Sequence, residues 1–218
     1  SYTVTVPATK TLRWHASGAP QAPSESRGSA GVSYTWKAES LAPIELEPEG
    51  PPLREVLPWV SVSTVPSWEA VAQWWRQIAL LRISADPPIQ DWVEKQTAGL
   101  SDPRSKLKAI FEGLQKEIRY VALEFGRGGY EPHWAHEVFL NRYGDCKDQT
   151  ILLLAMLQEA GIKAGPALIR TASAGPLAED TPSPGEFNHV IVWAEADGQE
   201  FWLDPSSGSC PFGEIPLE

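Results

Sequence analysis

The sequence has very little cysteine: Cys146 and Cys210 are the only two in 218 residues. Two cysteines allow one disulfide at most, so a disulfide framework is excluded as the source of stability for a chain of this length. Such cysteines are ordinarily small buried side chains. Cys210 lies in a tail rich in Ser, Gly and Pro and is assigned no role, whereas the neighbours of Cys146 indicate a chemical one.

Long apolar runs and an excess of positive charge are also absent. No stretch reaches the roughly 18 apolar residues of a membrane span. The net charge of −10 repels phosphate backbones and anionic lipid surfaces, which argues against nucleic acid as a partner and leaves no evident membrane contact. Ser1 to Val4 provide neither an initiating Met nor a signal peptide. We therefore expect a segment of a longer protein, with its targeting signal elsewhere and its compartment unknown.

What the sequence does contain is enough apolar side chain for a packed core. Hydrophobic residues make up 42% of the chain, and ten tryptophans add large apolar surfaces. Residues 1–66 are predicted to be part of a β-rich domain, because Tyr2, Val4 and Val6 alternate with threonines and frequent prolines favour short edge strands. Ala16–Gly31 is predicted to be a loop rich in Gly, Ser and Pro.

Helical periodicity follows. Residues 67–102 are predicted to be a helical connector, with one helix from Ser67 to about Ile83 and a second, shorter one after it. Asp102 is predicted to cap a third helix, which begins the core domain over residues 103–218. The apolar stripes of these helices are interpreted as core, and no cofactor is expected.

The core domain has a second helical signal followed by strands. Gly126–Tyr130 lacks the Lys-Ser/Thr ending of a phosphate-binding loop, so a plain turn is predicted there. Gln149–Ala160 is apolar almost all round and predicts a buried helix, which Gly161 ends. A strand is predicted over Ala164–Arg170, and an exposed loop over Thr171–Glu186.

The position of Cys146 suits a nucleophile. A thiol attacks only as its thiolate, so it needs surroundings that favour negative charge and a base within reach. With Asp145 as N-cap, Cys146 falls at the first helical position, where free backbone amides and the helix dipole favour an anionic sulfur and can also bind an oxyanion. Asp145 and Asp148 oppose the thiolate by their charge, and the sequence alone leaves that balance open.

A hairpin brings a candidate base and a carboxylate together. Asp197-Gly198 between two apolar runs predicts a two-residue turn, which places Ile191 opposite Asp204. His189 and Asp204 then share a face as diagonal neighbours, with backbone positions about 7 Å apart. A three-residue turn would send their side chains to opposite faces. In this pattern Cys146 attacks a carbonyl, His189 moves the proton and Asp204 orients the histidine.

These residues resemble a known family. Asn141 to Asp148, with the apolar helix after it, Phe187 to Val192 and Trp202 to Pro205 are similar to the transglutaminase-like superfamily over roughly residues 103–206. The Cys, His and Asp blocks occur in the family's order. The resemblance implies an α+β protein with a papain-like core, in which the nucleophile helix packs on an antiparallel sheet. It also implies a catalytic triad of Cys146, His189 and Asp204.

Two further features come from resemblance. Residues from Ser1 to about Trp75 are similar to the C-terminal part of a β-rich domain of unknown function in bacterial exported proteins, which implies a periplasmic or surface location. The family tends to place an aromatic or Gln side chain beside the oxyanion, for which Tyr120, Tyr130 and Trp134 are candidates.

A zinc site is the competing interpretation of the histidines. His133 and His136 are three residues apart, and Glu131, Glu137 or Cys146 could join them as ligands. No second ligand pair has suitable spacing, so surface or capping histidines are favoured and no metal is expected.

The sequence therefore predicts acyl transfer on a peptide or protein amide through a thioester at Cys146. Whether water or an amine accepts the acyl group, as in a protease or amidase or in a transglutaminase, is left open, as are calcium dependence and oligomeric state. The alternative is a non-catalytic module that binds peptide or cell-envelope ligands on the same fold. Because Thr171–Glu186 precedes His189, a further hypothesis is that this loop gates or selects substrate.

Overall fold

The computed structural model describes residues 1–218 except 19–21, 46, 49, 123–128, 209 and 216–218. Most of the turn predicted at Gly126–Tyr130 lies outside the described residues. The chain forms two compact units. Unit 1 comprises Ser1–Ala72 and Arg170–Phe187, and unit 2 comprises Gln73–Ile169 and Asn188–Glu218. The structure combines helices with sheets that are antiparallel except for the short β6–β7 pair, so the predicted α+β class is confirmed.

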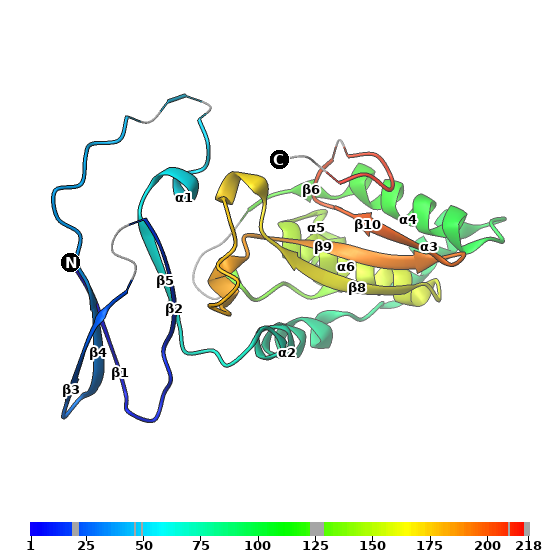
Figure 1. The fold of residues 1–218 in the computed structure, drawn as a ribbon. Helices are drawn as coiled ribbons and strands as arrows, with labels where there is room; N and C mark the ends of the chain where they lie inside the picture. The colour runs from blue at the N-terminus through cyan, green and yellow to red at the C-terminus, as the bar shows by residue number, and fades with distance from the viewer. Residues whose placement is uncertain (19–21, 46, 49, 123–128, 209, 216–218) are drawn as a thin grey trace. The chain divides into compact units, whose positions relative to one another are not determined.

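Unit 1 is built from short strands in two small antiparallel sheets (Figure 1). One has the order β1-β4-β3, and the other pairs β2 with β5. Buried Val6, Leu12 and Trp36 form the apolar centre. Along residues 1–66 the described elements are β1 (Tyr2–Val6), β2 (Arg13–Ser17), β3 (Ser24–Gly28), β4 (Gly31–Trp36), the short helix α1 (Leu53–Val56) and β5 (Trp59–Ser63).

The predicted loop Ala16–Gly31 is wrong in part, because β3 lies within it. Strand β3 reads Ser-Glu-Ser-Arg-Gly and is exposed throughout, so it has no apolar alternation for a sequence pattern to reveal. It forms as a hairpin partner of β4, with Gly28 opposite Gly31. Pairing with a neighbouring strand, rather than burial, defines this element.

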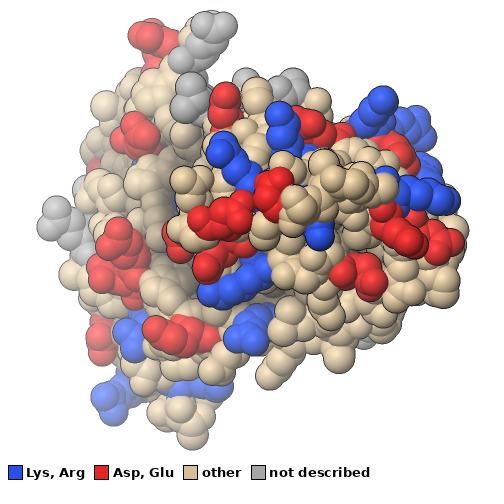
Figure 2. Space-filling view, turned by 90° about the vertical axis from the view of Figure 1, so that its right-hand side faces the viewer, with Lys and Arg blue, Asp and Glu red and all other residues tan. Residues whose placement is uncertain are grey.

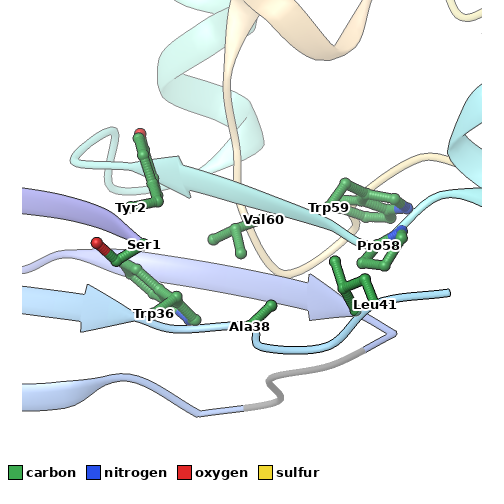
Figure 3. Close-up of a pocket in the computed structure, with 8 residues that line it drawn as sticks. All are labelled: Ser1, Tyr2, Trp36, Ala38, Leu41, Pro58, Trp59 and Val60. Atoms are coloured by element: carbon green, nitrogen blue, oxygen red, sulfur yellow. The ribbon is translucent and has the colours of Figure 1, made fainter. Parts of the chain in front are cut away.

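Unit 1 also contains a pocket of about 400 Å³ (Figure 3). Aromatic and aliphatic side chains from the ends of β1, β4 and β5 and from the segments beside them surround it: Tyr2, Trp36, Leu41, Pro58, Trp59 and Val60. Trp59 is held by a hydrogen bond from its Nε1 to the Arg54 carbonyl at 2.7 Å and by the Arg54 guanidinium 3.9 Å above its ring. The pocket wall is therefore formed in part by a fixed indole.

The segment Arg170–Phe187, which includes the exposed loop predicted over Thr171–Glu186, packs within unit 1 and has both exposed and buried residues. It contains two turns of 3₁₀ helix, η3 (Ala172–Ala174) and η4 (Pro184–Glu186). Glu186 is buried and accepts two hydrogen bonds from Arg54, at 2.7 and 2.9 Å. Burial opposes the carboxylate, but these bonds outweigh it and lower the pKa of Glu186. The partner of Glu186 lies more than 100 positions earlier in the chain. The local sequence could not reveal this ion pair, and its polar composition therefore predicted an exposed loop.

Unit 2 places one helix against a three-stranded sheet of order β10-β9-β8 (Figure 1). Helix α6 (Cys146–Glu159) crosses one face of this sheet, and α4 and α5 pack on α6. The remaining elements of this part of the chain are α2 (Trp68–Ala79, which starts in unit 1), η1 (Leu80–Arg82), α3 (Pro87–Thr97), α4 (Pro103–Glu117), β6 (Arg119–Tyr120), α5 (Ala135–Asn141), β7 (Tyr143–Gly144), β8 (Lys163–Ile169), β9 (His189–Ala196) and β10 (Gln199–Leu203).

The helix ends in unit 2 form where the sequence predicts them. Asp102 caps α4 by accepting from the backbone N–H of Ser105 at 2.8 Å. Helix α6 is buried on nearly every side and ends at Gly161, whose φ of +70° suits glycine. The N–H of Ile162 then donates to the carbonyl of Leu157 at 2.9 Å, which closes the helix in a Schellman arrangement.

On the face in Figure 2, acidic and basic side chains are interspersed, and no continuous basic stripe crosses it. Among the helices that the structure describes, none has the length and apolar character needed to cross a bilayer.

Candidate active site

The candidate nucleophile lies at the start of α6. Cys146 is the first helical residue, and Asp145 caps the helix by accepting from the N–H groups of Lys147 at 3.1 Å and Asp148 at 3.2 Å. Asp148 accepts in return from the N–H of Asp145 at 3.3 Å, which completes a capping box. The helix start that carries the sulfur is therefore fixed on both sides of Cys146.

Both carboxylates beside Cys146 have partners of their own. The Lys147 ammonium pairs with Asp145, and both side chains are buried. Asp148 accepts from His133, through the backbone N–H at 2.7 Å and through Nδ1 at 3.0 Å. The sequence left open how strongly these two charges oppose a thiolate. The structure shows that each is engaged by neighbouring donors, which weakens that opposition.

The hairpin has the predicted register. Strands β9 and β10 pair with Gln199 opposite Ala196 and Leu203 opposite Val192, which corresponds to a two-residue turn. The turn residues have positive φ, +53° at Asp197 and +72° at Gly198, as a type I′ turn requires. The predicted parity of the hairpin is therefore confirmed.

This parity brings His189 and Asp204 together. Nε2 of His189 lies 2.8 Å from Oδ2 of Asp204. The other carboxylate oxygen accepts from the backbone N–H of Ser206 at 2.9 Å and from its hydroxyl at 2.7 Å. Because Asp204 takes Nε2, Nδ1 is the ring nitrogen left for Cys146.

The electrostatics of the pair depend on all three candidate residues. Burial opposes the imidazolium, but hydrogen bonds to Asp204 and Cys146 and the charges of both outweigh it and raise the pKa of His189 to about 10. Asp204 shows the converse: burial is outweighed by bonds from His189 and Ser206, and its pKa is lowered. A charged imidazole beside a sulfur and a carboxylate can stabilise a thiolate and supply a proton.

Two polar side chains hold the strands against the helices, and sequence reasoning missed both. Thr150 on α6 donates from its hydroxyl to the carbonyl of Val190 at 3.3 Å, next to His189. Gln115 on α4 donates to the carbonyl of Ser207 at 2.7 Å, with the Asp204 and Cys210 carbonyls also within 3.4 Å. Thr150 is a polar residue in a helix predicted to be buried, and this could have indicated a hydrogen-bonding role. The sequence around Gln115 contains no comparable signal.

The three oxyanion candidates occupy different places. Tyr120 is in β6 opposite Gly144, Tyr130 packs edge-on to Trp74 at 5.6 Å, and Trp134 is the N-cap residue of α5. All three rings are substantially exposed. The geometry does not distinguish one of them as the oxyanion partner.

The competing interpretations receive no support from the side chains that the structure describes. His133 bonds to Asp148, whereas the ring of His136 lies 6.2 Å from that of Trp134. Within the described ranges, no group of three or more His, Cys, Asp or Glu residues could hold a metal ion. Cys210 is a free thiol that donates to the Glu214 carbonyl at 3.1 Å, and burial raises its pKa.

Comparisons with known proteins identify the family and a similar fold. A family model described as the transglutaminase-like superfamily matches residues 90–206, more than half of the chain. The crystal structure of a candidate protease from Parabacteroides distasonis superposes with a TM-score of 0.71 at 20% identity, over 92% of this chain and 39% of that one. The chain thus spans about two fifths of that protein.

A second solved structure, a candidate cysteine protease from Cytophaga hutchinsonii, has a TM-score of 0.45 and 14% identity, covering 94% of this chain and 70% of that one. No curated protein is similar enough to count as a match.

Proposed function

The chain belongs to the transglutaminase-like superfamily, and from that premise we propose that it transfers the acyl group of a peptide or protein amide through a thioester on Cys146. At the level of the family it is a cysteine-dependent enzyme. The observation that carries the proposal is the 2.8 Å contact between His189 Nε2 and Asp204 Oδ2, which leaves Nδ1 for a sulfur at the first position of a helix.

Acylation begins with the Cys146 thiolate attacking the carbonyl carbon, which forms a C–S bond and a tetrahedral oxyanion. Asp145 already accepts from the N–H groups of Lys147 and Asp148, so the backbone N–H of Cys146 is the group at the start of α6 that can stabilise that oxyanion. His189 then donates its Nδ1 proton to the leaving nitrogen as the C–N bond breaks, and the amine departs. Asp204 keeps the ring oriented and stabilises its charged form throughout.

Deacylation reverses the proton movement. Water or an amine attacks the thioester carbon while neutral His189 accepts its proton, and the C–S bond breaks to restore the thiolate and imidazolium. Hydrolysis releases an acid, whereas transfer to an amine forms a new amide. Both outcomes use the same three residues.

Selective alkylation tests the proposal directly. We expect iodoacetamide near pH 7 to label Cys146 at least tenfold faster than Cys210, because a neighbouring imidazolium favours the thiolate whereas burial raises the pKa of Cys210. His189→Ala should remove most of that advantage. Peptide mass spectrometry follows each thiol separately, so Cys210 is an internal control. Equal, slow labelling of both thiols would instead favour the non-catalytic binding module.

Acylation provides the second arm of the test. p-Nitrophenyl acetate should leave an acetyl group on Cys146, seen as a mass increase on its peptide, and Cys146→Ser should abolish the rapid release of nitrophenol. Absence of an acyl adduct in a protein whose Cys146 alkylates rapidly would contradict the acyl-transfer mechanism.

A further inference from the structure

A second histidine–carboxylate pair lies beside the nucleophile and has no part in the proposed proton transfers. Asp148 is in the first turn of α6, two residues after Cys146, and its side chain is 5% exposed. His133 approaches it from the segment before α5 and donates from both its backbone N–H and its ring Nδ1. The His133 side chain is 54% exposed, so one edge of the ring is held while much of the rest faces solvent.

The four residues Glu131–Trp134, here called the strap, are fixed at a second point. Glu131 pairs with Arg82 at 2.9 Å, and the Arg82 guanidinium lies 5.7 Å from the ring of Trp134. The Arg82 side chain also donates to the Ile78 carbonyl, which anchors it to the end of α2. The strap is thus tied to one helix through Glu131 and to the nucleophile helix through His133.

The buried end of this pair has little freedom to move. A Cβ on Gly144 would lie 2.6 Å from the Cβ of Asp148, so only glycine allows this close approach. Gln149 donates to the Gly144 carbonyl at 3.0 Å and holds the same segment from the other side. Asp148 is therefore a fixed acceptor, and the position of the strap depends on whether His133 reaches it.

We propose that His133 and Asp148 are positioning residues for the acyl-transfer site, and that they hold the strap, with the exposed Trp134 ring, as a wall against which a peptide substrate binds. This inference rests on the proposed function. Loss of the His133 ring would leave the strap bound to α6 by its backbone alone. The triad contacts through His189 would remain, so substrate binding should weaken while the sulfur stays reactive.

Substitution of His133 by Asn or Gln provides a matched test, because the side-chain amide nitrogen of each residue can replace a different nitrogen of the histidine ring. His133→Asn can place its amide nitrogen where Nδ1 lies, whereas His133→Gln places it nearer the position of Nε2. For hydrolysis of a panel of dipeptidyl 7-amido-4-methylcoumarins, we expect the KM of His133→Gln and His133→Ala to rise about tenfold with kcat changed less than about threefold. His133→Asn should stay close to the wild type. Acylation of Cys146 by p-nitrophenyl acetate should change little in all three variants.

Hydrogen exchange tests the same inference without a substrate. The backbone N–H groups of His133 and Trp134, which donate to Asp148 and Glu137, should exchange slowly in the wild type and in His133→Asn, and faster in His133→Gln. Equal KM values and equal exchange rates in the Asn and Gln variants would overturn the positioning role. If the wild type hydrolysed none of the amides while the three proteins showed the expected exchange pattern, the proposed function would be contradicted. The attachment of the strap through His133 would still be supported.

Discussion

At the scale of single residues, the protonation of His189 depends on side chains from three different segments. Its ring is buried enough to disfavour charge, but Asp204 and Cys146 together raise its pKa to about 10. In the unfolded chain the same ring would have its ordinary pKa of 6.5. The raised pKa keeps His189 an imidazolium across the neutral range in the folded protein, which is the form that the proposed acyl transfer requires.

The pH dependence of amide turnover follows from this residue. Activity should fall as the pH rises through about 10, because the imidazolium then loses the proton it must donate. Asp204→Ala removes the largest contact that raises the pKa, so this alkaline limb should move to lower pH, with kcat reduced on the order of 10³-fold or more. Pre-steady-state acylation rates across the pH range measure both effects.

Ser206→Ala serves as the matched control for that prediction. It removes one of the two donors that Ser206 supplies to Asp204 and leaves the contact with His189 in place. The alkaline limb of this variant should therefore move much less than that of Asp204→Ala. If the alkaline limb lay at the same pH in the wild type, Asp204→Ala and Ser206→Ala, a group other than His189 would control the loss of activity.

At the scale of secondary structure, the β9–β10 hairpin determines whether the site exists. Side chains alternate between faces of a strand, so a register shift of one residue moves a side chain to the opposite face. The two-residue turn at Asp197 and Gly198 is the feature that places His189 and Asp204 on one face.

Lengthening this turn tests the parity argument. One glycine inserted after Gly198 should shift the pairing and separate His189 from Asp204, lowering amide turnover on the order of 10²-fold or more. Two inserted glycines restore the parity and should recover much of that loss. Circular dichroism on both proteins checks that the fold is retained. If the one-glycine and two-glycine variants had equal activity, the result would contradict the dependence on register.

The local elements of unit 2 were predictable because their signals lie within a few residues. The caps at Asp102 and Asp145, the stop at Gly161 and the turn at Asp197-Gly198 all arise from short-range backbone chemistry. Helix α5 and the β6–β7 pair were not predicted. The two paired strands have two residues each, too few for a periodic pattern to appear.

At the scale of the whole molecule, the segment Arg170–Phe187 leaves the sheet of unit 2 after Ile169 and returns just before His189, yet it packs as part of unit 1. Its gating role stays a hypothesis. Glu186 is central to its packing, so deleting the whole segment would remove a buried ion pair together with any gate. A test of gating should keep Glu186 and shorten only its exposed residues.

Stability against pH should reflect the groups with shifted pKa values. Glu186 and Asp204 have lowered folded pKa values, so their contribution is present above their unfolded values and is lost as the pH falls through the folded ones. His189 has a raised value, so its contribution is complete below 6.5 and is lost as the pH rises through about 10. Stability should therefore decline on both sides of the weakly acidic range.

Glu186→Gln isolates one of these contributions. It leaves Arg54 and Arg170 without their buried counter-charge, which should lower the free energy of unfolding by about 3 kcal/mol at neutral pH. The difference from wild type should shrink as the pH falls, because the wild-type carboxyl is then protonated too. Urea unfolding at several pH values measures this, with exposed Glu195→Gln as the control. A pH-independent difference would mean that the charge of Glu186 is not what matters.

The division of the chain into residues 1–66, 67–102 and 103–218 stays a prediction, as does an exported location. The sequence by itself determined the helix ends, the turn type and the parity that pairs His189 with Asp204, because each depends on backbone geometry within a few residues. Only the tertiary structure decided which ring nitrogen meets Asp204 and which donors reach Asp148 and Glu186. The contacts of Asp148 and Glu186 join residues that lie 15 and 132 positions apart. No local pattern records such partners, since packing of the completed chain selects them.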